Sequence, residues 1–216
     1  MDVLELMRER HSIRKYTDQP IEQEKREVLD ALCAEINEES GLSIQMMYDE
    51  PDCFNNFLTH YGWFQNVNNY ISVAGKKGKD LDEKCGYYGE KLVLKAQELG
   101  LNTCWAAMTK GRSRSEVANG EKVAIVIAIG YGDEPGEPHK NKERKKLVKE
   151  PAMAPEWFER GVEAAMLAPT AMNQQKFKIS LDGDDAKITA GLGFMAKLDL
   201  GIIKYHFEVA SGHKVK

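Results

Sequence analysis

The chain has 216 residues, a formal net charge of −4 and four cysteines. This length suits one domain with a sizeable core or two smaller halves, and the charge gives no reason to expect binding to nucleic acid or to a membrane surface. No apolar run approaches the roughly 20 residues that span a bilayer, and the acidic start Met1–Glu5 lacks the apolar core of a signal peptide. The cysteines form no C-x-x-C pair and the histidines show no metal-ligand spacing, so we expect reduced thiols and no metal. A soluble, cytoplasmic protein is the expectation.

The first half of the chain predicts helices and strands in alternation. A short helix is expected around Leu4–Arg8, and Thr17–Pro20 is typical of a turn and helix N-cap. Helical spacing predicts a second helix from Gln23 to about Ile36, with its apolar face formed by Val28, Ala31, Leu32 and Ile36. Two strands are expected at Leu42–Tyr48 and Ile71–Ala74, then a buried helix at Tyr87–Leu99 that ends at Gly100.

The second half begins with the most apolar segment of the chain. Val123–Ile129 is β-branched and almost continuously apolar, which predicts a central strand. A Gly/Pro-rich loop (130–139) and a basic run (140–149) follow. Trp157–Leu167 then has the spacing of an amphipathic helix, and Phe177–Leu181 the period of a strand.

The chain also shows signs of an internal repeat. Val28–Ala34 aligns with Val162–Ala168, and at the same offset Ser43–Met47 falls on Phe177–Leu181. Gly89 and Gly100 are expected to bracket one helix, and Gly201 and Gly212, which have the same spacing, another. Chance similarity between two amphipathic helices is the alternative.

Two segments carry groups suited to ligand binding. Arg10–Arg14 places two guanidiniums and a hydroxyl within five residues, a good donor set for a phosphate and for polar ring edges. Ala168–Gln175 is a helix end broken by Pro169 and followed by small and amide residues. The amide of Asn173 donates and accepts together, as recognition of a flavin's pyrimidine edge requires.

These segments and three others resemble motifs of the FMN-dependent nitroreductase family. Arg10–Tyr16 is similar to the family's R-x-S-x-R segment, Gly100–Trp105 to G-L-G-T-C-W, Val123–Gly132 to its terminal strand and glycine turn, Lys142–Lys145 to K-x-R, and Ala168–Gln175 to A-P-S-x-x-N-x-Q-P. The resemblance implies an α+β, nitroreductase-like fold with a central, mostly antiparallel sheet flanked by helices. It implies one domain over residues 1–216, with possible halves 1–150 and 151–216.

The order of the motifs departs from the family pattern. In typical members the A-P-S-x-x-N loop follows the first long helix, but here Glu35–Ser40 holds that place and the loop follows the second helical copy. Typical members are homodimers with FMN at the interface. The repeat therefore suggests a rearranged, tandem-half subgroup, in which the chain is a monomer that mimics a dimer, or a homodimer. Lys176 stands where the family often has Pro-Trp, which puts the ring contact there in doubt.

The resemblance assigns roles to particular residues. Arg10, Arg14, Lys142 and Arg144 are the expected phosphate ligands, and one or more of Arg10, Ser12 and Arg14 is expected to reach the pyrimidine side of the ring as well. Trp105–Met108 is expected as a turn that lines the ring near N5, with the backbone N–H of Ala107 or Met108 as donor. The expected cofactor-binding set is Arg10, His11, Ser12, Arg14, Trp105, Ala107, Met108, Lys142, Arg144, Pro169, Thr170 and Asn173. No catalytic side chain and no metal are expected, because the flavin carries the chemistry.

The implied function is an FMN-dependent NAD(P)H oxidoreductase that reduces nitroaromatic, quinone or similar acceptors by ping-pong hydride transfer through flavin N5. The alternative is a non-catalytic flavin-binding or storage protein of the same fold, and a third possibility is a scaffold that has lost the flavin. The pocket walls at 105–110 and 54–63 bear on this choice.

Several of these site residues could instead have a purely structural role. The two arginines could pair with Glu5, Glu9 or Asp18 on a solvated surface, and residues 140–149 could be a solvated charge run. Cys104 and Trp105 could be core residues, and Asn173 a helix cap.

Overall fold

The computed structural model describes residues 2–55, 63–107, 111–149 and 153–216. The chain divides into two compact units, each discontinuous in sequence. Unit 1 comprises Met1–Glu9, Asp82–Lys91 and Pro138–Lys216, and unit 2 comprises Arg10–Leu81 and Leu92–Glu137. The domain organisation expected from the sequence stays a prediction, and the two units are described separately below.

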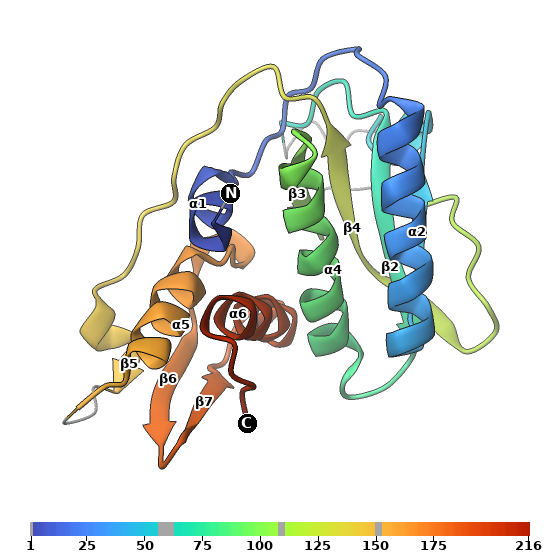
Figure 1. The fold of residues 1–216 in the computed structure, drawn as a ribbon. Coiled ribbons are helices and arrows are strands. Elements are labelled where there is room, and N and C mark those ends of the chain that lie inside the picture. The colour runs from blue at the N-terminus through green and yellow to red at the C-terminus, as the bar shows by residue number, and fades with distance from the viewer. Residues whose placement is uncertain (1, 56–62, 108–110, 150–152) are drawn as a thin grey trace. The chain divides into compact units, whose positions relative to one another are not determined.

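Unit 2 is built on an antiparallel sheet of four strands (Figure 1). Its strands are β1 (Ser43–Met47), β2 (Asn69–Lys76), β3 (Asn102–Ala106) and β4 (Glu121–Gly130), in the order β1-β2-β4-β3. The expected central strand is confirmed, because β4 pairs with β2 on one side and β3 on the other. β2 is buried along its length except at Lys76, so both faces of the sheet are covered.

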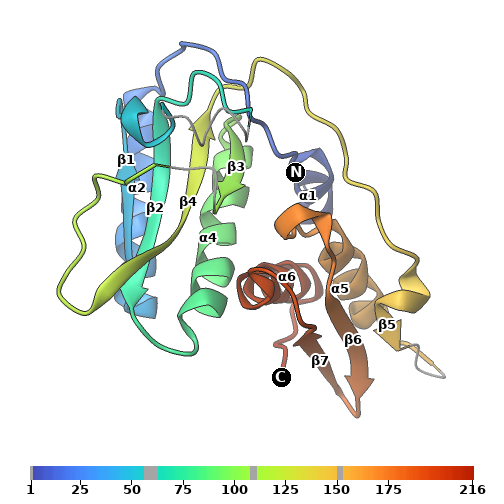
Figure 2. The ribbon, with the colours of Figure 1, turned by 180° about the vertical axis from the view of Figure 1, so that it is seen from behind.

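Helices cover one face of this sheet. α2 (Gln23–Ser40) and the C-terminal part of α4 (Leu81–Glu98) lie on the same side of the strands in both ribbon views (Figures 1 and 2). A core cluster that includes Phe54, Phe64 and Tyr70 packs with Cys104 and Ala106 of β3. The predicted mixed fold, with an antiparallel sheet flanked by helices, is confirmed.

The apolar face predicted for α2 is confirmed at Ile36 and wrong at Val28 and Ala31. Val28 is 43% exposed and Ala31 is exposed as well, whereas the helix buries Leu29, Cys33 and Ile36. The expected N-cap is wrong too: Glu22 occupies the cap with no side-chain hydrogen bond. Thr17 instead accepts a hydrogen bond from the backbone of Gln19, which makes 17–20 a turn only.

Glu35–Ser40 is the last part of α2 and does not form a loop. Asn37 on this segment donates to the carbonyl of Ile44 and accepts from its N–H, at 2.8 and 2.7 Å. The end of the helix therefore anchors the start of β1.

Unit 1 combines α1 (Val3–Glu9), the N-terminal part of α4, α5 (Glu156–Leu167) and α6 (Ala196–Ser211) with a small sheet. α1 and α5 pack with α6. The sheet has the order β5-β6-β7, from β5 (Val148–Lys149), β6 (Phe177–Asp182) and β7 (Asp185–Ala190). Short 3₁₀ turns lie at Arg144–Lys146 (η2) and Ala171–Asn173 (η3) in this unit, and at Pro51–Cys53 (η1) in unit 2. The predicted strand after α5 is confirmed, since Phe177 and Ile179 are both buried.

Two glycines mark the closest approach of α4 and α6 within unit 1. A Cβ on Gly86 would lie 2.0 Å from the carbonyl oxygen of Leu198, and one on Gly201 would lie 1.9 Å from that of Glu83. The expectation that glycines bracket these helices is therefore wrong at one end. Gly89 and Gly201 lie inside helices, whereas Gly100 and Gly212 follow helix ends with φ of 76° and 72°.

The order of elements is similar in two parts of the chain. α2-β1-β2-α4 and α5-β6-β7-α6 each run helix, strand, strand, helix, and β1 and β6 lie at the predicted offset. The internal repeat itself stays a prediction. Within the described ranges, no helix is both long enough and apolar enough to cross a membrane.

Candidate functional site

In unit 2, the arginine-rich segment extends the sheet at the edge of β3. Ser12 forms a parallel bridge with Thr103, and the N–H of Ile13 donates to the carbonyl of Thr103 at 3.1 Å. Ile13 is fully buried, and the hydroxyl of Tyr16 donates to its carbonyl at 2.7 Å. These contacts fix the backbone on which Arg10 and Arg14 are carried.

Arg10, Ser12 and Arg14 all act on the thiol of Cys104. Burial raises the pKa of this thiol, while the charges of Arg14 and Arg10 and a hydrogen bond with Ser12 act to lower it. Arg10 is only 4% exposed, and its Nε is buried with no hydrogen-bond partner. Arg14 is exposed.

The surface ion pairs considered as an alternative are not found. Among the described residues, neither Arg10 nor Arg14 pairs with Glu5, Glu9 or Asp18. A buried, unsatisfied guanidinium nitrogen is costly unless an acceptor reaches it. The cluster is therefore a set of cationic donors that suits an anion or the carbonyl edge of a ring.

His11 is held by the loop that follows β4. Its Nδ1 lies 3.0 Å from the carbonyl oxygen of Pro135 and, since a carbonyl can only accept, this nitrogen is the donor. Gly136 has φ of 71°, and a Cβ there would lie 2.6 Å from Cδ1 of Ile13 and 2.7 Å from Cβ of His11. The loop thus packs against the arginine-bearing segment.

Gly136→Ala is expected to lower the free energy of unfolding by about 2 kcal/mol, because strain at positive φ and crowding against Ile13 and His11 add together. Urea denaturation measures this loss. Gly120→Ala is the matched control: its φ is 88° but the added methyl meets nothing within 4 Å, so only the strain of about 1 kcal/mol should appear. Equal losses in the two variants would contradict the packing argument.

The expected turn at Trp105–Met108 is wrong at its start. Trp105 and Ala106 belong to β3 and pair with Ile127 and Val126 of β4. Ala106 is buried, whereas Trp105 and Ala107 are partly exposed. Met108–Lys110, including the expected contact Met108, lies outside the described residues, as do residues 56–62 of the second pocket wall.

In unit 1, the second predicted segment forms a loop with unusual backbone geometry. α5 ends at Leu167, and Ala168 is extended, as a residue before proline prefers to be. Pro169 and Thr170 are partly exposed. Met172, Asn173 and Gln175 have φ of 52°, 51° and 42°. Residues other than glycine rarely adopt this left-handed backbone region.

Two buried side chains, neither identified from the sequence, hold this loop. The amide of Gln175 donates to the carbonyl of Lys140 and to Oδ1 of Asn173, and its oxygen accepts from the N–H of Lys142. The carboxylate of Asp199, on the first turn of α6, accepts from the N–H of Ala171. Both side chains are buried, at 3% and 4% exposure.

The sequence itself contains a signal for Gln175, because this residue ends the motif Ala168–Gln175. Asp199 could not be found in that way. It lies well beyond the end of the motif and reaches the loop only through the fold.

Asn173 keeps hydrogen-bonding capacity for a ligand. Its side chain donates once, to the carbonyl of Lys140 at 2.9 Å, and accepts once, from Gln175 at 2.7 Å. A side-chain amide offers two donor hydrogens and two lone pairs. One of each is left, and Asn173 is exposed.

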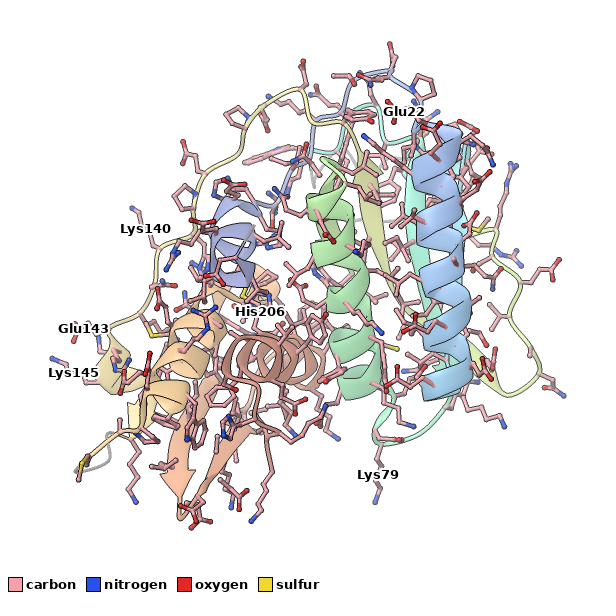
Figure 3. All side chains as sticks on the ribbon, viewed as in Figure 1. Glu22, Lys79, Lys140, Glu143, Lys145 and His206 are labelled. Atoms are coloured by element: carbon pink, nitrogen blue, oxygen red, sulfur yellow. The ribbon has the colours of Figure 1, made fainter. Side chains whose placement is uncertain are left out.

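The two cations predicted from the basic run are engaged within the protein. Nζ of Lys142 donates to the carbonyls of Gln174 and Gln175. Arg144 pairs with Glu159 at 2.8 Å and lines an open cavity of ≈ 610 Å³ whose wall also carries Glu156 and Glu163. Carboxylates beside Arg144 disfavour a dianion there. Glu143 and Lys145 project away from the ribbon near Lys140 (Figure 3), as a solvated charge run does.

A buried histidine lies elsewhere in unit 1. His206 on α6 (Figure 3) donates from Nδ1 to the carbonyl of Ala164 at 3.0 Å, and its Nε2 lies 2.9 Å from Oε1 of Glu90. Both side chains are fully buried. The pair ties α4, α5 and α6 together.

Comparison with solved structures shows the fold. A structure described as a putative nitroreductase from Thermotoga maritima is 22% identical, with 97% of this chain and 83% of that chain covered and a TM-score of 0.72. A putative nitroreductase in complex with FMN from Desulfovibrio desulfuricans is 21% identical, over 69% and 96% of the chains, with a TM-score of 0.52. A putative NADH dehydrogenase/NAD(P)H nitroreductase from Bacteroides thetaiotaomicron is 18% identical, over 67% and 95%, with a TM-score of 0.52.

Sequence comparison identifies the family. No curated protein matches the chain. Residues 2–211, however, match the family model described as "Putative TM nitroreductase". The match spans nearly the whole sequence and agrees with the fold of the solved structures, so the chain belongs to this nitroreductase family.

Proposed function

We propose that the protein is an FMN-dependent NAD(P)H oxidoreductase that reduces nitroaromatic, quinone or similar acceptors. The observation that carries the proposal is the buried guanidinium of Arg10, whose Nε lacks a partner, within a cluster that also holds Ser12 and Arg14. Family membership and the FMN named for a structure of the same fold support it.

The residues of this cluster fit FMN. The cofactor offers a phosphate dianion and, on the pyrimidine side of its ring, carbonyl oxygens and a ring nitrogen that accept hydrogen bonds. Arginine donates in a planar fork and keeps its charge at all relevant pH values. Arg14 is exposed and free of ion pairs with described residues, so it binds an anion without first breaking a contact.

The loop of unit 1 carries groups that also suit a flavin ring. The remaining N–H and lone pair of Asn173 fit a ring edge on which donors and acceptors alternate. Thr170 uses its oxygen to accept from the N–H of Gln175, so its hydroxyl hydrogen is left to donate. Lys142 holds the carbonyls of this loop, and we therefore assign it to the loop and not to the phosphate.

When bound, FMN supplies the redox chemistry by exchanging a hydride at N5. The protein's part is then to bind the cofactor, to place cations where the reduced ring carries negative charge, and to leave one ring face open. No residue is needed as a general acid or base. We propose that the nicotinamide and the acceptor use that face in turn, which gives ping-pong kinetics.

Visible absorption spectroscopy tests the proposal. The purified protein is loaded with excess FMN, desalted, and titrated with NADPH and NADH without oxygen. We expect a retained yellow chromophore that one of the two nicotinamides bleaches, and that menadione or a nitroaromatic restores. Dithionite serves as the control for full reduction.

The other outcomes contradict the proposal in different ways. A yellow protein that dithionite bleaches and neither nicotinamide does would indicate a flavin-binding or storage protein. A protein that retains no FMN would leave the family's fold without its proposed cofactor.

A further inference from the structure

Loop 168–175 of unit 1 is held in a conformation that its own residues do not favour. Met172, Asn173 and Gln175 all have positive φ, and none is a glycine. Asparagine tolerates this region, but Met172 and Gln175 each cost on the order of 1 kcal/mol or more, so the conformation persists only where surrounding contacts impose it. Strained backbone of this kind is concentrated at ligand-binding sites in proteins.

The carboxylate of Asp199 supplies two of those contacts. It accepts from the backbone N–H of Ala171 at 2.9 Å and from the side-chain amide of Gln174 at 2.8 Å. These two donors lie on either side of Met172 and Asn173. The same Gln174 amide also donates to the carbonyl of Phe194, just before α6. The strained residues are therefore clamped to the start of that helix.

Burying the carboxylate of Asp199 costs free energy, which an apolar residue that only fills space would not. Asp199 is 4% exposed, and burial raises the pKa of its carboxyl group to about 6, although the hydrogen bonds from Ala171 and Gln174 act to lower it. Its place in the first turn of α6 gives partial compensation from the helix dipole. A buried charge kept at this cost points to a demand for geometry at the loop.

We propose that Asp199 is a positioning residue for flavin binding: by holding Ala171 and Gln174 it fixes loop 168–175 so that Asn173 presents its remaining N–H and lone pair to the flavin. The inference rests on the proposed function. Asp199 itself touches no ligand and acts through Asn173.

The first test is made on the protein without flavin. Asp199→Asn keeps the size of the side chain, but both of its partners are donors, so an amide oxygen satisfies one of them and its NH₂ group faces the other. We expect amide hydrogen exchange at Ala171 to accelerate by about tenfold or more. Because the cost of burying a charge is removed as well, the unfolding midpoint should change little.

The second test follows FMN affinity by the quenching of flavin fluorescence. We expect Asp199→Asn to raise the FMN Kd by about tenfold. The double variant with Asn173→Ala should bind no more weakly than Asn173→Ala alone, because a residue that acts through another is not additive with it. Asp184→Asn is the matched control, since it removes the same charge from an exposed turn.

The outcomes separate this inference from the proposed function. FMN affinity in Asp199→Asn equal to that of the Asp184→Asn control would overturn the inference, and so would independent losses that multiply in the double variant. If the unsubstituted protein binds no FMN, the proposed function fails, and flavin positioning by Asp199 fails with it. Normal binding that Arg14→Ala weakens and Asp199→Asn does not would leave the function standing and remove only Asp199.

Discussion

Replacing Arg10 or Arg14 with alanine is expected to weaken FMN binding by about 100-fold each, because a hydrogen bond to a charged group contributes on the order of 1.5–3 kcal/mol. Arg14→Ala is the cleaner variant, since the side chain is exposed and its loss should not disturb folding. Arg10 is buried, so Arg10→Lys is added to keep the charge while removing the planar fork. Isothermal titration calorimetry with FMN measures the effect.

A parallel titration with riboflavin separates the two roles that the arginines could have. Riboflavin lacks the phosphate, so loss of a phosphate ligand should weaken FMN binding strongly and riboflavin binding little. Loss of a ligand of the pyrimidine side should weaken both equally. We expect the ratio of the loss in FMN affinity to the loss in riboflavin affinity to differ between the Arg14 and Arg10 variants, since Arg14 is exposed and Arg10 is buried.

Arg8→Ala is the matched control for both titrations. Arg8 lies two residues before Arg10, but it is exposed and pairs with Glu163. An exposed pair of this kind contributes less than about 1 kcal/mol, so FMN affinity should stay within about twofold. If Arg8→Ala weakens binding as much as Arg14→Ala, general charge and not the proposed cluster attracts the cofactor.

The elements with strong local signals could be predicted from the sequence. The β-branched run at 123–129 indicated the central strand, and helical spacing indicated α5 almost to its ends. Both signals come from burial patterns that one segment carries alone. β3 has no strong local signal, because Asn102–Ala106 is short and mixed in polarity and its last two residues fall in the predicted turn 105–108; its pairing with β4 makes it a strand.

The error in the predicted buried face of α2 has a different cause. In α2 both Val28 and Leu29 are apolar, so periodicity alone does not choose between a face with Val28 and Ala31 and a face with Leu29 and Cys33. The packing of the helix on its sheet makes that choice. Burial of Leu29 and Cys33 is a tertiary result that the local pattern does not contain.

The residues of the candidate site also divide into those that the sequence indicates and those that only the fold brings into place. Residues that act by chemical type, such as the arginines and Asn173, could be proposed from the sequence. Residues that act through the fold could not. Lys142 was predicted as a phosphate ligand from its charge, but its Nζ is bound by carbonyls of a loop much later in the chain. Asp199 reaches that same loop from a helix whose sequence gives no sign of it.

Gly201→Ala is the substitution in unit 1 for which we expect the largest loss of stability. In an isolated helix, alanine in place of glycine stabilises by about 1 kcal/mol. Here the added methyl would lie 1.9 Å from the carbonyl oxygen of Glu83 and 2.6 Å from the backbone nitrogen of Tyr87. Both are helix backbone atoms, which cannot move aside as a side chain can. The helices must separate, and we expect a loss of about 3 kcal/mol or more.

The effect is measured as the thermal midpoint and as the free energy of unfolding in urea. A loss of this size lowers the midpoint by about 10 °C in a protein of this length. Gly86→Ala should behave in the same way, because it meets the carbonyl of Leu198 from the other helix. The double variant should lose less than the sum, since separation of the helices relieves both clashes at once.

Gly212→Ala is the control within the same helix. Gly212 ends α6 with φ of 72°, and a methyl there meets nothing within 4 Å, so only the strain of about 1 kcal/mol is expected. If Gly201→Ala costs no more than Gly212→Ala, the two helices do not approach as closely as described. A large and non-additive loss would instead identify the crossing of α4 and α6 as the contact that requires glycine.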